Sequence, residues 1–266
     1  MSSVDKDYVT CRRMTVALGT FVAIEARRAF DGECARALDD ACAAFEIVES
    51  RMHPRTPTGD LAAINAAAPG APISIHPWTF AVLSLARQMC EASGGLFDPC
   101  LPDRPGRMCD VELIAPHAVR RTGPPVSIDL GGIAKGFAID RAVEALQAAG
   151  CVDGLVNAGG DLRVFGSEVR AVDLRGPDGR TRPLPLVDRA LAVSGPKTAR
   201  SPSEHQGFYS PLTGLPVLGR CVAVLAPSAA VADALTKCAI VCPLEALEGL
   251  LKRYDAELLT LDSPAA

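Results

Sequence analysis

The sequence has no apolar run of about 18 residues, the length at which a membrane-spanning helix is expected. It also has little net charge, because 27 basic and 31 acidic side chains leave −4 at pH 7 with histidine neutral. Basic residues are scattered, so neither nucleic acid nor an acidic membrane surface is expected as a partner. The 48% hydrophobic and 22% charged residues are typical of a globular protein. The 266 residues can form one large domain or two smaller ones.

The sequence lacks a C-x-x-C pair, although it contains ten cysteines. Their spacing shows no disulfide framework, and Cys238 and Cys242 fall on one face if their stretch is helical. We therefore expect buried free thiols rather than disulfides or metal ligands. The charges of Asp5, Lys6 and Asp7 precede an apolar run that glycine and threonine interrupt, so a secretory signal is not expected. These features favour a cytoplasmic, reduced protein.

The central stretch, residues 127–166, predicts two glycine turns around a helix and a strand. The first turn, residues 129–136, precedes a helix that ends at Gly150, a residue type favoured just beyond a helix. Apolar side chains recur in it at helical spacing: Ile139, Val143, Leu146 and Ala149. An apolar strand at 155–158 then leads to a second turn at Gly159 and Gly160.

Glycines before a helix allow close approach of a ligand, and the free N–H groups there suit an anion such as a pyrophosphate. The first turn also carries an acid, Asp129, and an amine, Lys135. Alternatively, the turn is an ordinary connection between a strand and a helix and binds no ligand. Two well-known nucleotide motifs do not match. The turn lacks the G-x-G-x-x-G register of a Rossmann fold, and Lys135 is followed by Gly136 rather than by the Ser or Thr of a Walker A loop.

Patterns elsewhere predict further elements. A strand pair or one long strand is expected at 14–26, with an irregularity at Gly19. We expect helices capped by Asp31 and by Ser228, and a third between Pro77 and Gly94. Residues 103–125 are polar and proline-rich, so we expect irregular structure there. Further strands are expected at 169–174, 190–195, 221–226 and 256–261.

The spelling D-L-G-G-I-A-K-G-F-A-I-D at 129–140, followed by N-A-G-G-D-L at 157–162, resembles the signature of the FAD:protein FMN transferase (ApbE) family. Other words resemble that family's and follow its order: L-G-T at 18–20, D-L-x-x-I-N at 60–65, G-x-F-D-P at 95–99, S-G at 194–195, H-(six residues)-L-T-G at 205–214 and A-D-A-L-T at 232–236.

The resemblance implies one domain over residues 1–266 of the α+β class. Its sheets would be mostly antiparallel with packed helices, in two interlocked lobes with a flavin cleft between them. The implied activity is covalent attachment of FMN, taken from the substrate FAD, to a Ser or Thr of an acceptor flavoprotein, with release of AMP. Mg²⁺ is the implied metal, because it can neutralise charge on the phosphate oxygens.

The resemblance also implies site residues. Those that would contact the flavin nucleotide are Leu18, Leu96, Phe97, Asp98, Asp129, Lys135, Gly159, Gly160, Ser194, Gly195 and His205. His205 is the implied base for the acceptor hydroxyl, since imidazole titrates near neutrality, and Lys135 would hold the nucleotide. The implied metal position comprises Gly132, through its carbonyl, and Asp233, Thr236 and Lys237.

Three features depart from the family pattern. Lys237 stands where the family usually has Thr, and its ammonium would either turn outward or take the metal's place. Ser210 replaces an acid or amide before a proline, and the segment between Asp98 and Asp129 is short. The loop before Asp60 has no aromatic residue to hold the adenine, which leaves His53 as a substitute.

Two alternatives therefore stay open beside the transferase. One is a flavin-binding paralogue that has lost turnover and acts as carrier, sensor or assembly factor. The other is an unrelated nucleotide-binding enzyme or a structural interaction module.

Overall fold

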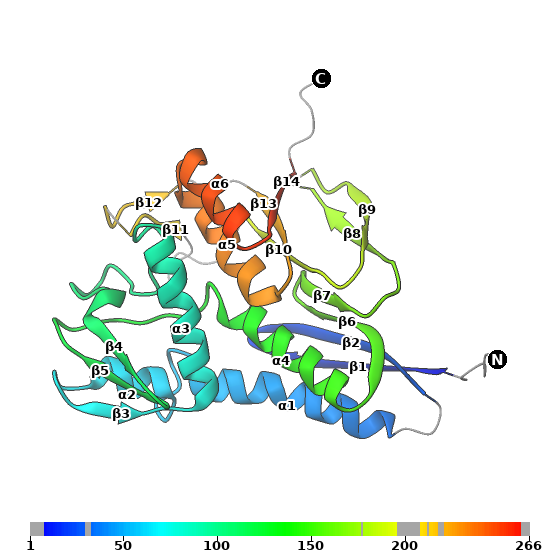
Figure 1. Cartoon of the computed structure of the whole chain (residues 1–266), viewed down its shortest axis with the longest axis horizontal. Helices are drawn as coiled ribbons and strands as arrows, with labels where there is room; N and C mark the ends of the chain where they lie inside the picture. The colour runs from blue at the N-terminus through cyan, green and yellow to red at the C-terminus, as the bar shows by residue number, and fades with distance from the viewer. Residues whose placement is uncertain are drawn as a thin grey trace.

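The computed structural model describes residues 8–29, 33–176, 178–195, 208–211, 213–217 and 221–261. Its centre is a seven-stranded sheet in which every neighbouring pair is antiparallel (Figure 1). In spatial order its strands are β1 (Tyr8–Ala17), β2 (Thr20–Ala29), β6 (Cys151–Ala158), β7 (Asp161–Phe165), β10 (Ala190–Ser194), β13 (Val222–Ala226) and β14 (Glu257–Thr260). The predicted α+β class with mostly antiparallel sheets is confirmed.

Two tight turns at one end of this sheet have left-handed backbone conformations. Leu18 and Gly19 join β1 to β2 with φ of 51° and 71°, and Gly159 and Gly160 join β6 to β7 with φ of 65° and 102°. Such turns match the twist of hairpin strands. The predicted strand pair around Gly19 is therefore confirmed as a hairpin.

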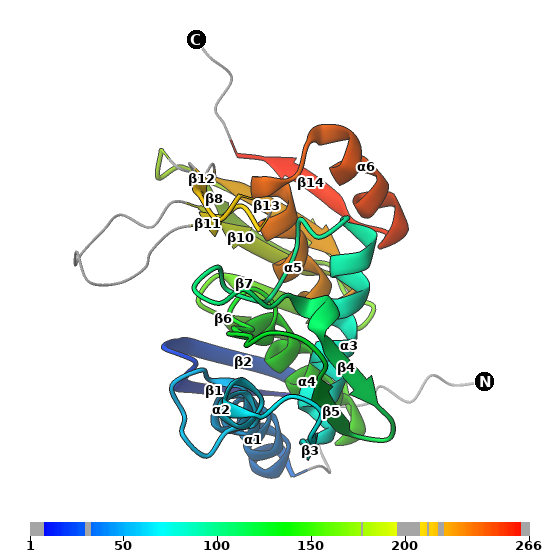
Figure 2. The same ribbon diagram turned by 90° about the vertical axis from the view of Figure 1, so that its left-hand side faces the viewer.

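Helices cover one face of the sheet, as the side view shows (Figure 2). They are α1 (Cys34–Met52), α4 (Ala134–Ala148) and α5 (Ala229–Val241). The other helices pack on these three: α2 (Asp60–Ala66) and α3 (Pro77–Ala92) on α1, and α6 (Leu244–Arg253) on α5. The apolar faces of α1, α4 and α5 share one core with the inward side chains of the sheet; Phe45 and Leu235 of the helices and Ile24 and Val156 of the strands all belong to it. Burial of these faces stabilises the fold by about 25 cal/mol for each Å² of apolar surface.

A second, smaller core lies on the opposite face of the sheet. The hairpin of β8 (Arg170–Arg175) and β9 (Thr181–Leu186) covers β7, β10 and β13 there. Val172 and Leu174 of the hairpin pack against Leu162, Leu191 and Leu225 of the sheet. The sheet is therefore apolar on both faces at this end, which explains why Val222–Ala226 is an uninterrupted buried run.

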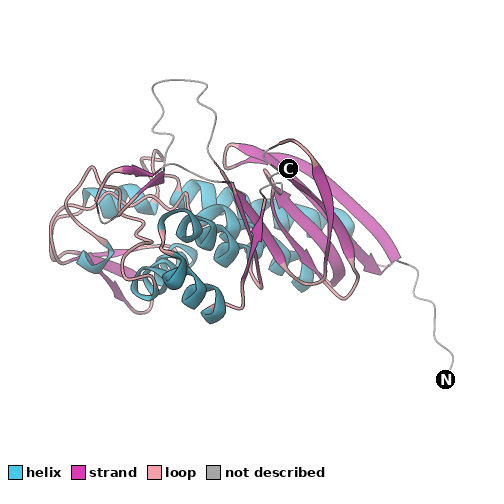
Figure 3. Cartoon of the chain, turned by 90° about the horizontal axis from the view of Figure 1, so that it is seen from above, coloured by secondary structure: helices cyan, strands magenta, loops and turns pink. Residues whose placement is uncertain are grey.

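A small sheet stands at the other end of the molecule (Figure 3). It contains β3 (Pro72–Ser74), β5 (Ala118–Arg121) and β4 (Val111–Ile114), and a 3₁₀ turn at Met108–Asp110 precedes it. The expectation of irregular structure at 103–125 was therefore wrong for 108–114 and 118–121, and the rest of the segment forms turns and irregular loops. Val111 and Val119 are buried within very short strands, and the polar, proline-rich residues around them concealed the pattern. A separate pair, β11 (Phe208–Tyr209) and β12 (Pro216–Val217), lies near α5.

The expected helix boundaries are mostly confirmed. The helix after the first glycine turn ends before Gly150, whose φ is 84°, and Ser228 Oγ accepts the N–H of Val231 at 3.3 Å as the cap of α5. Asp31, the expected cap of the first helix, lies outside the described residues, and α1 begins at Cys34. Neither β3 nor α6 was anticipated.

One expectation about cysteine was wrong, because Cys11 and Cys34 form a disulfide. It joins β1 to the start of α1, which the β1–β2 hairpin brings together although 23 residues separate the two in sequence. The other eight cysteines are free thiols, as expected; Cys100, Cys151, Cys238 and Cys242 are buried, whereas Cys109 is exposed. Among the described residues, none of the helices has the length and apolar character to cross a membrane.

Candidate nucleotide and cation site

Three side-chain oxygens surround the ammonium of Lys237 where α5 meets the end of β10. Lys237 Nζ donates to Ser194 Oγ and to Thr236 Oγ1, each at 3.0 Å, and it forms an ion pair with Asp233 Oδ1. The Asp233 side chain is fully buried, whereas 22% of the Lys237 side chain is exposed. The ammonium therefore points inward, which answers the question that the sequence left open.

Every hydrogen of this cluster can be assigned. Thr236 Oγ1 donates its proton to the backbone carbonyl of Asp233 at 2.7 Å, so the 2.8 Å contact with Ser194 uses the Ser194 proton. The second carboxylate oxygen of Asp233 accepts the N–H of Gly136 at 3.2 Å. Because an ammonium has three N–H donors, Lys237 is saturated by these three oxygens.

The residues present do not fit a magnesium ion together with Lys237. Mg²⁺ needs oxygen ligands in a near-octahedral shell, and the oxygens of Asp233, Thr236 and Ser194 that could supply them hold the ammonium instead. No cluster of three or more His, Cys, Asp or Glu side chains that could hold a metal occurs in the part of the chain that the structure describes. Asp233 and Thr236, two of the residues predicted at the metal position, hold the Lys237 ammonium in this structure.

A second lysine–aspartate pair lies close to the first. Lys135 Nζ, at the start of α4, lies 2.7 Å from Asp161 Oδ2 at the start of β7. The other oxygen of Asp161 accepts the N–H of Val193 at 2.9 Å, which ties β7 to β10. The Asp161 side chain is only 2% exposed.

Both of these charges have shifted pKa values. Burial opposes the charge of Lys135, but attraction by Asp161 and Asp233 outweighs it and raises the pKa of Lys135. Burial and repulsion from Asp233 raise the pKa of Asp161, against the attraction of Lys135 and Lys237. Two lysines and two aspartates thus form one electrostatic cluster with balanced formal charge.

The glycine turns lie around this cluster. A β-carbon placed on Gly132 would lie 3.4 Å from Lys237 Cγ and 3.8 Å from Phe97 Cε2, so Gly132, Lys237 and Phe97 are neighbours. Asp129 Oδ1 accepts the N–H of Gly131 at 2.7 Å and so shapes the turn itself. The predicted site residues of the first turn therefore meet those of α5.

The second glycine turn lies beside the first hairpin of the sheet. Gly159 donates its N–H to the Phe21 carbonyl at 3.1 Å, and a β-carbon on Gly159 would overlap the side chain of Thr20. Leu18 and Gly160 lie in these adjoining turns. Gly195, which follows β10, packs so closely that a β-carbon there would lie 2.7 Å from Cys221 Sγ.

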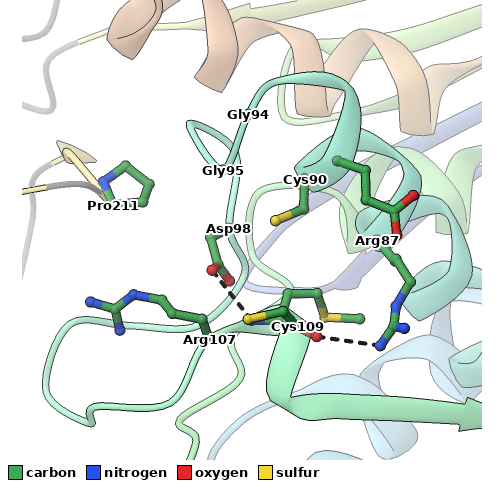
Figure 4. A pocket seen from close by; sticks show the side chains of 10 residues that line it. Arg87, Cys90, Gly94, Gly95, Asp98, Arg107, Cys109 and Pro211 are labelled. Carbon is green, nitrogen blue, oxygen red and sulfur yellow. Dashed lines mark hydrogen bonds between the residues drawn. The ribbon is translucent and has the colours of Figure 1, made fainter.

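A cavity of about 440 Å³ lies beside Gly94, Gly95 and Asp98 (Figure 4). Its wall includes Arg87, Cys90, Asp98, Arg107, Cys109 and Pro211. Asp98 accepts the N–H of Cys100 at 2.8 Å and of Met108 at 3.3 Å, so it fixes this wall. Burial raises the pKa of Cys90 to about 11. Lys237 does not line the cavity. Asp98 lines it, and the preceding residue, Phe97, lies beside Gly132 in the Lys237 cluster.

The structure thus brings most of the predicted residues together, with two qualifications. His205 lies outside the described residues. Ser194, predicted as a flavin contact, holds Lys237 and Thr236. Sequence reasoning also missed Asp140, whose carboxylate accepts the N–H groups of Ala229 and Ala230. Asp140 could have been recognised from the sequence, because it is an acidic residue four positions after Gly136 among apolar helix positions.

The seven-stranded antiparallel sheet with α1, α4 and α5 on one face defines a class of α+β protein that solved structures share. The flavinyl transferase ApbE of Pseudomonas stutzeri in its apo form matches with a TM-score of 0.80 at 18% identity, over 98% of this chain and 94% of that one. The apbe protein of Thermotoga maritima matches with a TM-score of 0.80 at 22% identity, over 94% and 93%.

The ApbE family model matches residues 18–103 and 105–260, and the chain belongs to that family. Two named relatives agree with this assignment. A protein of Treponema pallidum (strain Nichols), named FAD:protein FMN transferase, is 29% identical over 73% of this chain and 68% of its own length. A Rhodobacter capsulatus protein of the same name is 30% identical over 56% of this chain and 33% of its own length.

Proposed function

We propose that this chain is an FAD:protein FMN transferase that forms one domain with a flavin cleft. The observation that carries the proposal is the family match across residues 18–260, together with relatives that bear this name. In the reaction, a Ser or Thr hydroxyl oxygen of the acceptor protein bonds to the FMN phosphorus. The bridging P–O bond of FAD breaks, and AMP leaves with the bridging oxygen.

The described residues support a nucleotide site beside the Lys135 and Lys237 cluster. The charge of Lys135 suits the pyrophosphate, and Asp129 and Asp98 hold the turns that would contact the flavin. The proton of the acceptor hydroxyl would go to His205, whose role rests on the resemblance alone.

The acceptor is proposed to be a flavoprotein with an exposed Ser or Thr. The cytoplasm remains the proposed compartment, which the eight free thiols support, although a disulfide such as Cys11–Cys34 is typical of oxidising compartments. The second candidate function is a flavin-binding paralogue without turnover, and the saturated ammonium of Lys237 is the observation that favours it.

Incubation of the purified protein with FAD and flavinylatable acceptor domains tests the proposal. We expect flavin fluorescence on the denatured acceptor, and we expect His205→Ala to abolish it while His117→Ala, a change at an exposed turn, preserves it. If several acceptors stay unlabelled although FAD binds, the transferase assignment is wrong and the carrier function is favoured. Failure to bind FAD would contradict both.

A further inference from the structure

The side chain of Lys237 occupies a position whose geometry is that of a bound cation. Its nitrogen is ringed by a carboxylate oxygen of Asp233 and the hydroxyl oxygens of Ser194 and Thr236, which come from two elements. Hard cations choose ligands of this kind. The difference is that the cation here is covalently part of the chain.

The oxygens of this ring are held rigidly, so they cannot move aside for an added ion. Asp233 is fixed by the N–H of Gly136, and a β-carbon on Gly136 would overlap the carbonyl of Ala229. Backbone therefore packs on backbone where α4 meets α5. Thr236 is fixed in turn by its bond to the Asp233 carbonyl.

The stem of Lys237 is confined as well. Gly132 lies against its Cγ and Cε atoms, and Phe97, which is 7% exposed, adjoins the same position. An outward rotation would separate the ammonium from a fully buried carboxylate, Asp233, and leave that charge unpaired. Such an unpaired buried charge is strongly unfavourable.

The formal charges of the cluster also favour Lys237 over an added divalent ion. The lysines at 135 and 237 balance the aspartates at 161 and 233, which interact with one another electrostatically. A divalent ion added to this cluster would leave an excess of two positive charges. Removal of the Lys237 charge would leave one excess negative charge, which attracts a cation.

We propose that Lys237 replaces a divalent cation in this chain, so that the site binds the FAD pyrophosphate without Mg²⁺. The inference rests on the proposed function for the identity of the nucleotide. The fixed charge of Lys237, whose three N–H donors are already bonded, would attract the phosphate oxygens through space. Asp233, Ser194 and Thr236 are positioning residues in this arrangement.

Binding of Mn²⁺, followed by its electron paramagnetic resonance signal with and without FAD, tests the inference. For the wild-type chain we expect no site with a Kd below about 1 mM, and we expect EDTA to change FAD affinity by less than about twofold. A stoichiometric Mn²⁺ site in the wild-type chain that Asp233→Asn removes would overturn the inference. So would a loss of FAD affinity in EDTA.

The variant Lys237→Thr supplies the complementary measurement, because it removes the ammonium and adds a hydroxyl oxygen. We expect it to gain Mn²⁺ affinity by at least about tenfold over the wild type, and we expect Asp233→Asn in the same chain to remove the gain. Lys252→Thr, at an exposed position of α6, is the matched control and should bind as the wild type does. Equal Mn²⁺ binding by Lys237→Thr and Lys252→Thr would contradict the inference.

These readouts are separable from the proposed function. Mn²⁺ binding does not require an acceptor or turnover, so a chain that fails to label acceptors can still show the exchange of lysine for metal. Conversely, FMN transfer that occurs only with Mg²⁺ would overturn the role of Lys237 and leave the transferase assignment standing.

Discussion

Arg163 of β7 donates to Asp140 of α4 at 2.8 Å, and this pair fixes the start of a third element. The two oxygens of Asp140 accept the N–H groups of Ala229 and Ala230 at 2.9 Å each. These are first-turn donors of α5 that no helical carbonyl can satisfy, and a carboxylate is also stabilised by the helix dipole there. Asp140 therefore positions the helix that carries the cation site.

We expect Asp140→Ala to lower the free energy of unfolding by about 3–5 kcal/mol, because it leaves the Arg163 guanidinium and two helix N–H groups without their partner. Urea unfolding of the purified variant measures this loss. Asp173→Ala, at an exposed position of β8, is the control and should change stability by less than about 0.5 kcal/mol. Similar losses in the two variants would contradict the anchoring role of Asp140.

The close approach of α4 to α5 gives a second prediction. A β-carbon at Gly136 would overlap the Ala229 carbonyl, so Gly136→Ala should cost about 3 kcal/mol or more. A β-carbon at Gly249, within α6, would meet no atom within 4 Å, so Gly249→Ala should stabilise the chain by up to about 1 kcal/mol. Thermal unfolding of both variants tests the pair. A neutral Gly136→Ala would show that the two helices can move apart.

The ion pair of Lys135 and Asp161 gives a third prediction, through a double-mutant cycle. Lys135→Met should cost about 2–4 kcal/mol, because it leaves a buried carboxylate uncompensated. Addition of Asp161→Asn should regain part of that loss, since the amide can still accept the Val193 N–H and carries no charge. The exposed pair Arg120–Glu112 should show a coupling below about 1 kcal/mol. Equal coupling in the two cycles would mean that Lys135 and Asp161 are effectively solvated.

Much of the fold could be predicted from local signals in the sequence. Gly150 ended its helix and Ser228 capped its helix because each residue type acts on its own neighbours. The hairpin of β4 and β5 could not be found in this way, because strands of four residues are too short to show alternation. The Cys11–Cys34 disulfide likewise depends on a long-range contact that spacing does not reveal.

The sequence motifs of the candidate site could be recognised from the sequence, but the contacts between their side chains could not. The sequence placed Asp233, Thr236 and Lys237 on one helix, whereas the direction of the ammonium depended on Ser194 of a strand distant in sequence. Asp140 was overlooked because its partners, the first N–H groups of α5, are 89 and 90 residues away. Tertiary contacts of buried polar groups are what the sequence alone did not show.

A pH dependence of stability is expected from His76, the cap of α3. Its Nδ1 atom accepts the N–H of Trp78 at 3.1 Å, which requires that this nitrogen carry no proton. Burial and then repulsion from Arg51 lower the pKa of His76 from its ordinary value of 6.5, against the attraction of Asp60, while His117 lowers it further. The folded chain therefore keeps His76 neutral at a pH where the unfolded chain has already bound a proton.

The sign of the effect follows from proton linkage. Above the unfolded pKa of 6.5 both states are neutral at His76, so its contribution is constant. As pH falls from 6.5 toward the lowered pKa of the folded chain, the unfolded state binds more protons and stability decreases. His76→Asn should flatten this decrease between about pH 7.5 and pH 5.5, because asparagine also caps helices and does not titrate. Urea unfolding at both pH values measures the slope. An unchanged slope in His76→Asn would show that the histidine cap tolerates protonation, and that acid loss of stability comes from other groups.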